Sequence, residues 1–137
     1  MTGEYPYWET VPTRWKDNDV YGHVNNVVHY SLMDTVINAW MIRTAGFDPL
    51  TSETIALCVE SHCEYKAEVS FPDEIRVGLR VGKLGRSSVR WEVGMLRSDG
   101  TLVAQGHFVH VFVGRESRRP AAIVDPVRAE MQRLVVA

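Results

Sequence analysis

The residue types best suited to chemistry are concentrated in residues 14–26, which read Arg-Trp-Lys-Asp-Asn-Asp-Val-Tyr-Gly-His-Val-Asn-Asn. Two carboxylates, a glycine, an imidazole and three carboxamides stand directly before an apolar run that extends to Ala45. The start of a helix presents unpaired N–H groups and partial positive charge, which can hold a carbonyl oxygen as it becomes an oxyanion. A carboxylate beside such a helix start can act as a nucleophile or as a general base for water.

Asp19 is the first candidate for this carboxylate. Asp17 lies two residues away, and a neighbouring like charge raises the pKa of a carboxyl group. Gly22 permits close approach of the backbone. The alternative role for Asp19 is an Asx turn, in which the side chain only organises a tight loop. We expect Asp19 to be the reactive carboxylate and Asp17 to be a residue of the loop.

The other polar residues of the stretch also have two interpretations each. His23 either bonds to the loop backbone or donates to a substrate carbonyl or orients a water molecule. Asn25 and Asn26 are good helix caps, and one of them could also anchor a substrate carbonyl or a water. Asp34 lies two turns into the predicted helix and either has a protein partner or contacts a ligand.

The elements that would position these residues follow from the pattern of apolar residues. Residues 7–15 predict a strand, which Pro12 restricts to a sheet edge or a bulge. A long helix is predicted from Asn25 or Asn26 to Ala45, because Gly46 and a following proline stop it. Its apolar residues cover most of the circumference, which predicts a helix buried on most sides and wrapped by a sheet.

After the helix the apolar period changes to two, which is typical of strands. The Asp99-Gly100 pair indicates a hairpin, and Asp125 with Pro126 predicts a capped short helix over 126–135. The fold class is therefore α+β, one domain over residues 1–137 with a core of about 8–125 and a sheet of five to six antiparallel strands. The predicted strands after the helix are 55–69, which is half-buried, 74–84, 87–97 and 102–113, which is central.

Three histidines on the predicted strands are interpreted as surface or structural residues. His62 shares a strand face with Glu60 and Glu64, which indicates a solvated face. His107 and His110 are expected to point to opposite faces and to have no catalytic role.

The composition excludes several classes of function. The chain of 137 residues has 15 basic and 17 acidic residues, which gives no basic excess for nucleic acid or an anionic membrane. It has no apolar stretch of about 18 residues and no visible secretory signal. Cys58 and Cys63 are expected on opposite faces of one strand and not bonded to each other. These features predict a reduced, cytoplasmic protein, and no metal-ligand cluster is visible in the sequence.

The stretch from Arg14 to Asn26 resembles the R-x-x-D-x-D-x-x-G-H-V-N-N signature of hotdog-fold acyl-CoA thioesterases. These are of the 4-hydroxybenzoyl-CoA thioesterase type, which includes the YbgC-like branch. The long helix, the passage from Tyr65 to Glu74, the turn at residues 85–88 and the last strand also fit, so the resemblance covers about residues 8–125. The chain differs at His29, where the family often has tyrosine, and at Asp34, where glutamate is common.

The resemblance implies a hotdog fold, a homodimer with active sites at the interface and hydrolysis of an acyl-CoA or an acyl carrier protein thioester. A further pairing of dimers into a tetramer stays open. The catalytic carboxylate falls on Asp19, and the amide that polarises the thioester carbonyl falls near Asn26 or Val27. Neither a metal nor a redox cofactor is implied. Other expected contacts are Gly22, His23 and Asn25 for positioning, Tyr30 and Asp34 for the acyl group, and Lys83, Arg86, Arg118 and Arg119 for the phosphates of CoA.

Two alternatives to a thioesterase remain. The first is a non-catalytic hotdog module that binds an acyl-CoA or acyl-carrier ligand. The second, a hotdog dehydratase or hydratase, is weaker because Gly22-His23 continues as Val-Asn-Asn and not as Phe-Pro.

Overall fold

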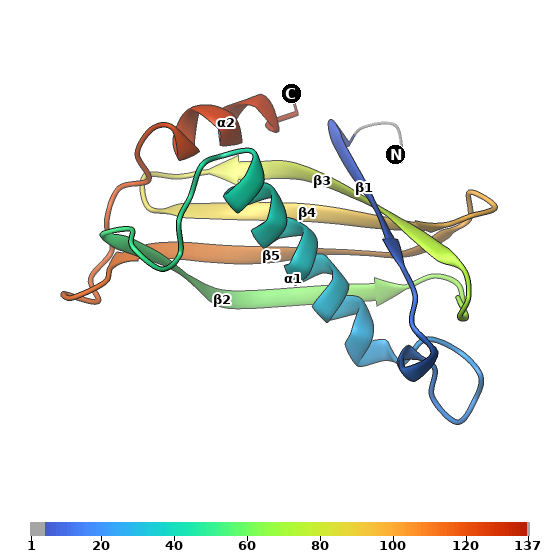
Figure 1. The fold of residues 1–137 in the computed structure, drawn as a ribbon. Helices are drawn as coiled ribbons and strands as arrows, with labels where there is room; N and C mark the ends of the chain where they lie inside the picture. Colours follow the sequence, from blue (N-terminus) through green and yellow to red (C-terminus); the bar gives the residue numbers. More distant parts are fainter. Residues whose placement is uncertain (1–4, 137) are drawn as a thin grey trace.

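A long helix lies across one face of an antiparallel sheet (Figure 1). The computed structural model describes residues 5–136. Within that range the sheet has five strands in the order β1-β3-β4-β5-β2, and every neighbouring pair is antiparallel. The elements are β1 (Tyr7–Pro12), a 3₁₀ turn (Trp15–Asp17), α1 (Asn26–Arg43), β2 (Thr54–Tyr65), β3 (Glu74–Leu84), β4 (Ser88–Arg97), β5 (Leu102–Gly114) and α2 (Val127–Arg133). The predicted α+β class and hotdog arrangement are confirmed.

The core fills the space between α1 and the sheet. Alternate residues of β3 and β4 point toward the helix and are fully buried, as the period of two predicts. Trp40 of α1 meets Trp91 of β4 edge to face, with ring centroids 5.5 Å apart. The buried residues of the two strands are Ile75, Val77, Leu79, Val81, Val89, Trp91, Val93 and Met95.

Helix α1 starts and stops where local chemistry dictates. The side chain of Asn25 caps it by accepting a hydrogen bond from the Val27 amide, and Gly46 follows its end with φ +74°. The prediction that the helix is buried on most sides is wrong for the single chain. Its buried residues recur every three or four positions and form one stripe, whereas Val27 is 67% exposed and Ile42 is also exposed.

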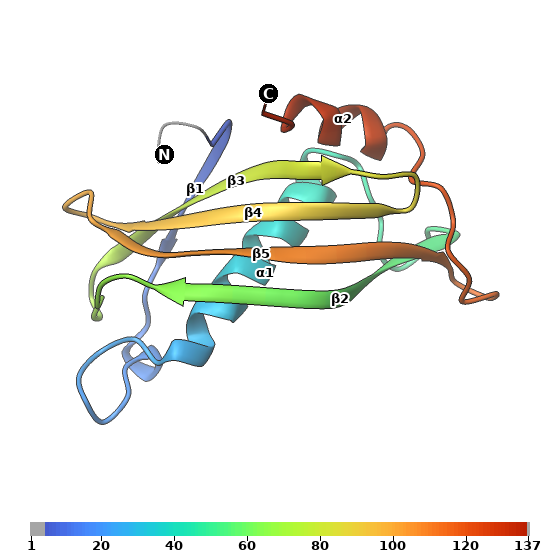
Figure 2. The ribbon, with the colours of Figure 1, turned by 180° about the vertical axis from the view of Figure 1, so that it is seen from behind.

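Strand β2 differs most from its predicted form. It forms the edge of the sheet (Figure 2) and is largely exposed rather than half-buried. A bulge at Val59 shifts its register against β5, so alternation does not run through the strand. Cys58 pairs with His110 and Cys63 with Gly106, positions four apart on β5, so the two cysteines share one face instead of opposite faces. Both thiols are free.

The remaining elements follow the sequence with small corrections. Pro12 ends an edge strand, and β5 is an interior strand as predicted. Gly100, with φ +87°, sits in the β4–β5 hairpin. Helix α2 is shorter than the predicted 126–135, and its cap is Pro126, without a side-chain cap from Asp125. None of the helices in residues 5–136 is long and apolar enough to cross a membrane.

Candidate active site

The loop before α1 is held in shape by Asp17. This carboxylate is 2% exposed and accepts hydrogen bonds from the backbone N–H and the guanidinium of Arg14, with a shortest distance of 2.8 Å. Its backbone carbonyl accepts from the Asn25 amide at 2.9 Å. Burial acts to raise the pKa of Asp17, but the bonds and charge of Arg14 outweigh it and the pKa lies below its usual value. Asp17 therefore fixes the loop, in agreement with the prediction.

Asp19 lies at the tip of the loop, partly exposed. Its Oδ1 accepts from the Tyr21 amide at 2.9 Å, so the Asx turn expected as the alternative is present. Its backbone carbonyl accepts from Gly22, which has the left-handed φ of +81° that favours glycine. Ser70 Oγ donates to the Gly22 carbonyl at 2.7 Å, which ties the loop to the segment before β3. Asp19 Oδ2 has no protein partner within residues 5–136, so it remains available.

The first turn of α1 leaves one amide available. The Val27 amide donates to Asn25 Oδ1 at 3.0 Å, and the Val28 amide donates to the Asn25 carbonyl at 2.9 Å. The Asn26 amide has no acceptor among the described residues. Of the two amides expected to polarise a carbonyl, those of Asn26 and Val27, only that of Asn26 is unoccupied within residues 5–136. Asn25 itself serves as the helix cap.

A pocket of about 740 Å³ joins these groups. Asp19, His23 and Asn26 all line it, which brings together three of the predicted site residues. His23 Nε2 lies 2.9 Å from Oε2 of Glu68, which also lines the pocket, and not against the loop backbone. Gly22, Asn25 and Val27 shape the surrounding backbone without lining this pocket. The pocket is lined by Asp19, Tyr21, His23, Val24, Asn26, His29, Tyr65, Lys66, Ala67, Glu68 and Val69.

Sequence reasoning missed His29, Tyr65 and Glu68 as pocket residues. Tyr65, at the end of β2, donates from its hydroxyl to the Asn26 carbonyl at 2.8 Å. Desolvation is the main cause that raises the pKa of Tyr65 to about 12. His29 meets the Tyr65 ring edge to face at 4.9 Å between centroids. Only His29 carried a signal in the sequence, because it lies three residues after Asn26 and hence on the same side of a helix.

The predicted acyl-contact residues line a second pocket. Tyr30 and Asp34 line a space of about 630 Å³ between the exposed side of α1 and strands β2 and β5. Phe108 and Ser61, which pair across the two strands, contribute to the same lining. Asp34 Oδ1 accepts from Asn38 Nδ2 at 3.1 Å, so Asp34 has a protein partner.

The four basic residues expected to meet phosphates lie away from this pocket in a single chain. Lys83 and Arg86 are at the end of β3 and its turn, and Arg118 and Arg119 follow β5. Because Thr54 pairs with Gly114 whereas Tyr65 pairs with Ala104, this is the opposite end of the sheet from the pocket (Figure 1). One chain by itself does not bring these residues to the candidate site.

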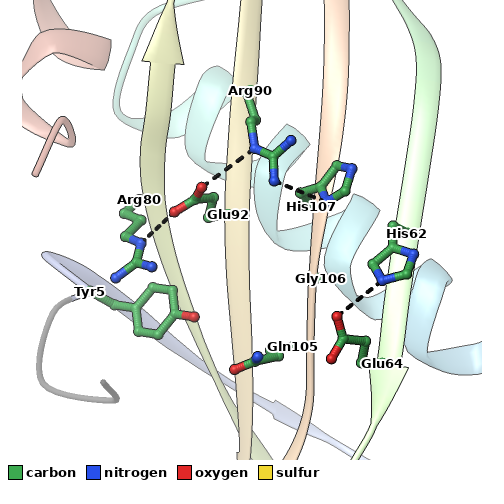
Figure 3. A pocket seen from close by; sticks show the side chains of 9 residues that line it. All are labelled: Tyr5, His62, Glu64, Arg80, Arg90, Glu92, Gln105, Gly106 and His107. Atoms are coloured by element: carbon green, nitrogen blue, oxygen red, sulfur yellow. Dashed lines mark hydrogen bonds and ion pairs between the residues drawn. The ribbon is translucent and has the colours of Figure 1, made fainter.

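The face of the sheet away from α1 carries a network of charged residues (Figure 3). Arg80 and Arg90 both bond to Glu92, at 2.7 and 3.4 Å, and Arg90 also contacts His107 Nδ1 at 3.3 Å. His107 bonds through Nε2 to Glu60, and its ring stacks on that of His62. We call Glu60, His62, Glu64, Arg80, Arg90, Glu92 and His107 the outer-face network. The predicted solvated face of Glu60, His62 and Glu64 is confirmed, and His110 points the other way, into the core.

The pocket at the start of α1 has the parts needed for attack on a carbonyl. A free amide at a helix N-terminus can hold an oxyanion, and a carboxylate oxygen without a protein partner can attack or activate water. No group of three or more His, Cys, Asp or Glu residues in the described part of the chain could hold a metal ion.

Comparison with known proteins shows the family and the fold of the chain. Residues 13–131 match the family model of the thioesterase-like superfamily. The PA5185 protein of Pseudomonas aeruginosa is 43% identical, with a TM-score of 0.94 and coverage of 98% of this chain and 95% of its own. The PA2801 protein of the same species is 27% identical, with a TM-score of 0.86 and coverage of 93% and 98%.

A more distant structure shows the same fold. Slr0204, a 1,4-dihydroxy-2-naphthoyl-CoA thioesterase from Synechocystis, is 14% identical, with a TM-score of 0.85 and coverage of 93% of this chain and 96% of its own. Together with the match over most of the sequence, these findings establish that the chain belongs to the thioesterase-like superfamily.

Proposed function

We propose that this protein is an acyl-CoA thioesterase, which hydrolyses a thioester to a free acid and CoA. The proposal depends on two groups that line the same pocket. One is the oxygen of Asp19 that has no protein partner, and the other is the unoccupied amide of Asn26. Membership of the thioesterase-like superfamily supports the reaction class.

In the proposed reaction the thioester carbonyl oxygen lies against the Asn26 amide. Negative charge that develops on this oxygen is stabilised by the N–H group and by the positive end of the α1 dipole. Asp19 either attacks the carbonyl carbon or removes a proton from the attacking water. His23, held by Glu68, positions the substrate in the same pocket. Because a thiolate is a good leaving group, the reaction needs neither a metal nor a redox cofactor.

The exposed edge of β2 suggests how the site is completed. This edge carries the exposed apolar residues Leu57 and Val59, and its unpaired backbone groups can pair with a second copy of the chain. Two-fold pairing of β2 with β2 would place the basic end of one copy beside the pocket of the other. Lys83, Arg86, Arg118 and Arg119 would then be near the phosphates of bound CoA, with Tyr30 and Asp34 near the acyl group.

The likeness to Slr0204 supports CoA as the carrier, since that protein acts on a CoA thioester. An acyl carrier protein would need the same basic end, so both carriers belong in the test.

Dimer formation is testable separately by sedimentation, where the substitution Val59→Lys on the β2 edge should yield monomers.

The test is thiol release from short, medium, long and aromatic acyl-CoAs and from an acyl carrier protein thioester. Wild-type protein should release thiol from at least one of these, and Asp19→Ala and Asp19→Asn should lose most of that activity. Turnover like that of wild type in both variants would contradict the assignment of Asp19.

A non-catalytic binding module is the second candidate. The observation in its favour is that Asp19 Oδ1 is already used by the Tyr21 amide in an Asx turn. Binding of CoA without hydrolysis of any substrate in the panel would favour this candidate over the thioesterase.

A further inference from the structure

We propose that His29 accepts the proton of the water molecule that hydrolyses the acyl group. This inference rests on the proposed thioesterase function and adds a residue to its chemistry. It starts from the position of the imidazole, which is 4% exposed and lines the same pocket as Asp19 and Asn26.

The hydrogen bonds of His29 fix its tautomer. Nδ1 lies 3.2 Å from the Asn25 carbonyl oxygen. A carbonyl oxygen has no proton to give, so Nδ1 carries the hydrogen and donates it. In a neutral imidazole, Nε2 then has a free lone pair and can only accept.

The position of this lone pair follows from its lack of a hydrogen-bond partner. No buried side-chain nitrogen or oxygen in residues 5–136 lacks a hydrogen-bond partner. Nε2 of His29 has no partner among these residues, so it cannot be one of the buried atoms. The ring is 4% exposed, meets Tyr65 edge to face and lines the pocket, so we infer that Nε2 is accessible from the pocket.

The surroundings keep the imidazole neutral. Burial lowers the pKa of His29, and the Asn25 and Asn26 carbonyl groups oppose this only in part. His29 shares its pocket with several other titratable side chains. The titratable side chains that share it are Asp19, Tyr21 and His23 from the loop, Tyr65 from β2, and Lys66 and Glu68 from the segment after it.

The proposed step balances. One O–H bond of water breaks, its proton moves to His29 Nε2, and the oxygen bonds to the acyl carbon. The bond from the acyl carbon to the leaving group then breaks, and the proton passes from His29 to that group. The leaving group is the Asp19 carboxylate of the anhydride that forms when Asp19 attacks the thioester and CoA leaves as its thiolate. Asp19 is bonded to the acyl carbon in this anhydride, so hydrolysis requires another proton acceptor, which is His29.

The test compares His29→Asn with a matched substitution, His110→Asn. His110 is also a buried histidine, but its Nδ1 accepts from Trp91 Nε1 at 3.0 Å in the core and it does not line the pocket. In each variant the asparagine can keep the bond made by Nδ1 and removes Nε2. We expect kcat of His29→Asn to fall by about 100-fold or more, with KM within about threefold, as for loss of a general base. His110→Asn should keep kcat within about threefold of wild type.

The pH profile gives a second readout. Wild-type kcat should fall on the acid side as His29 protonates, at a pH below the ordinary histidine value of about 6.5. His29→Asn should lose this limb, and His23→Gln should retain it. Retention of both kcat and the limb by His29→Asn would overturn the inference and leave the thioesterase proposal intact.

The tautomer is measurable without turnover. Nitrogen–proton correlation spectra of the imidazole at pH 7 should show His29 neutral with the proton on Nδ1. A proton on Nε2 would overturn the inference alone. Absence of hydrolysis of every substrate by the wild-type protein would contradict both the proposed function and this inference.

Discussion

The pocket at the start of α1 and the outer-face network both contain carboxylates and histidines, but they differ in how their polar atoms are used. In the network each charged side chain has a protein partner, as with Arg80 and Arg90 on Glu92. In the pocket an Asp19 oxygen, the Asn26 amide and His29 Nε2 have no partner among the described residues. Polar atoms that the fold leaves without partners are those that can bind a substrate, whereas paired atoms serve the fold.

Asp17 provides the strongest effect on stability. Asp17→Asn removes a buried negative charge from Arg14, and hydrogen bonds to charged groups contribute about 1.5–3 kcal/mol each. We expect the free energy of unfolding to fall by about this amount in urea denaturation. The kcat of the folded protein should stay within about tenfold of wild type, because other bonds still hold the loop backbone. Unchanged stability would show that the paired carboxylate is not a structural group.

Protonation of buried imidazoles should lower stability in mild acid. Burial lowers the pKa of both His29 and His110 in the folded protein, so the unfolded chain binds more protons below about pH 6.5. Stability is therefore present above that pH and decreases as the pH falls toward the folded-state values. His110→Asn should show a smaller difference between its urea midpoints at pH 7.5 and pH 5 than wild type. An equal difference in the two proteins would contradict the role of His110.

Tyr65 connects the end of β2 to the start of α1. Tyr65→Phe removes the hydroxyl that donates to the Asn26 carbonyl and should lower stability by about 0.5–1.5 kcal/mol. Because this bond fixes the backbone next to the Asn26 amide, we also expect a rise in KM or a fall in kcat of a few-fold. Steady-state kinetics with the best substrate of the panel measures both, and a complete absence of change would argue against a positioning role.

The outer-face network should show the smallest effects. Glu92→Gln removes the charge shared by Arg80 and Arg90, and partly exposed ion pairs contribute about 0.2–1 kcal/mol. The loss of stability should shrink as salt is added, and kcat should not change. A large loss of kcat in this variant would contradict the view that the pocket serves catalysis and the outer-face network serves the fold.

The sequence predicted most accurately the features that depend only on neighbouring residues, such as the ends of α1. Asn25 and Gly46 bound α1 because a cap and a left-handed stop need only neighbouring residues. The bulge at Val59 was not predictable, since it depends on how β2 pairs with β5. For the same reason alternation alone assigned the wrong faces to Cys58 and Cys63.

The same limit applies to the candidate site. Asp19, His23 and Asn26 are close together in the sequence, and their types and spacing made them candidates before the structure showed that they line one pocket. Tyr65 lies 39 residues after Asn26, and Glu68 is further still, so only the folded chain brings them to the pocket. Helical spacing places His29 on the same side of α1 as Asn26. Whether its Nε2 has a partner depends on the surrounding structure, which the spacing does not predict.

The most direct measurement is kcat for thiol release by Asp19→Asn and Asp17→Asn, with the best acyl-CoA of the panel. The two substitutions are chemically identical and lie two residues apart. Loss of the available carboxylate at Asp19 should lower kcat by about 10²–10⁴-fold, whereas loss of the paired one at Asp17 should act mainly on stability. Equal turnover by the two variants, or activity of Asp19→Asn like that of wild type, would contradict the account.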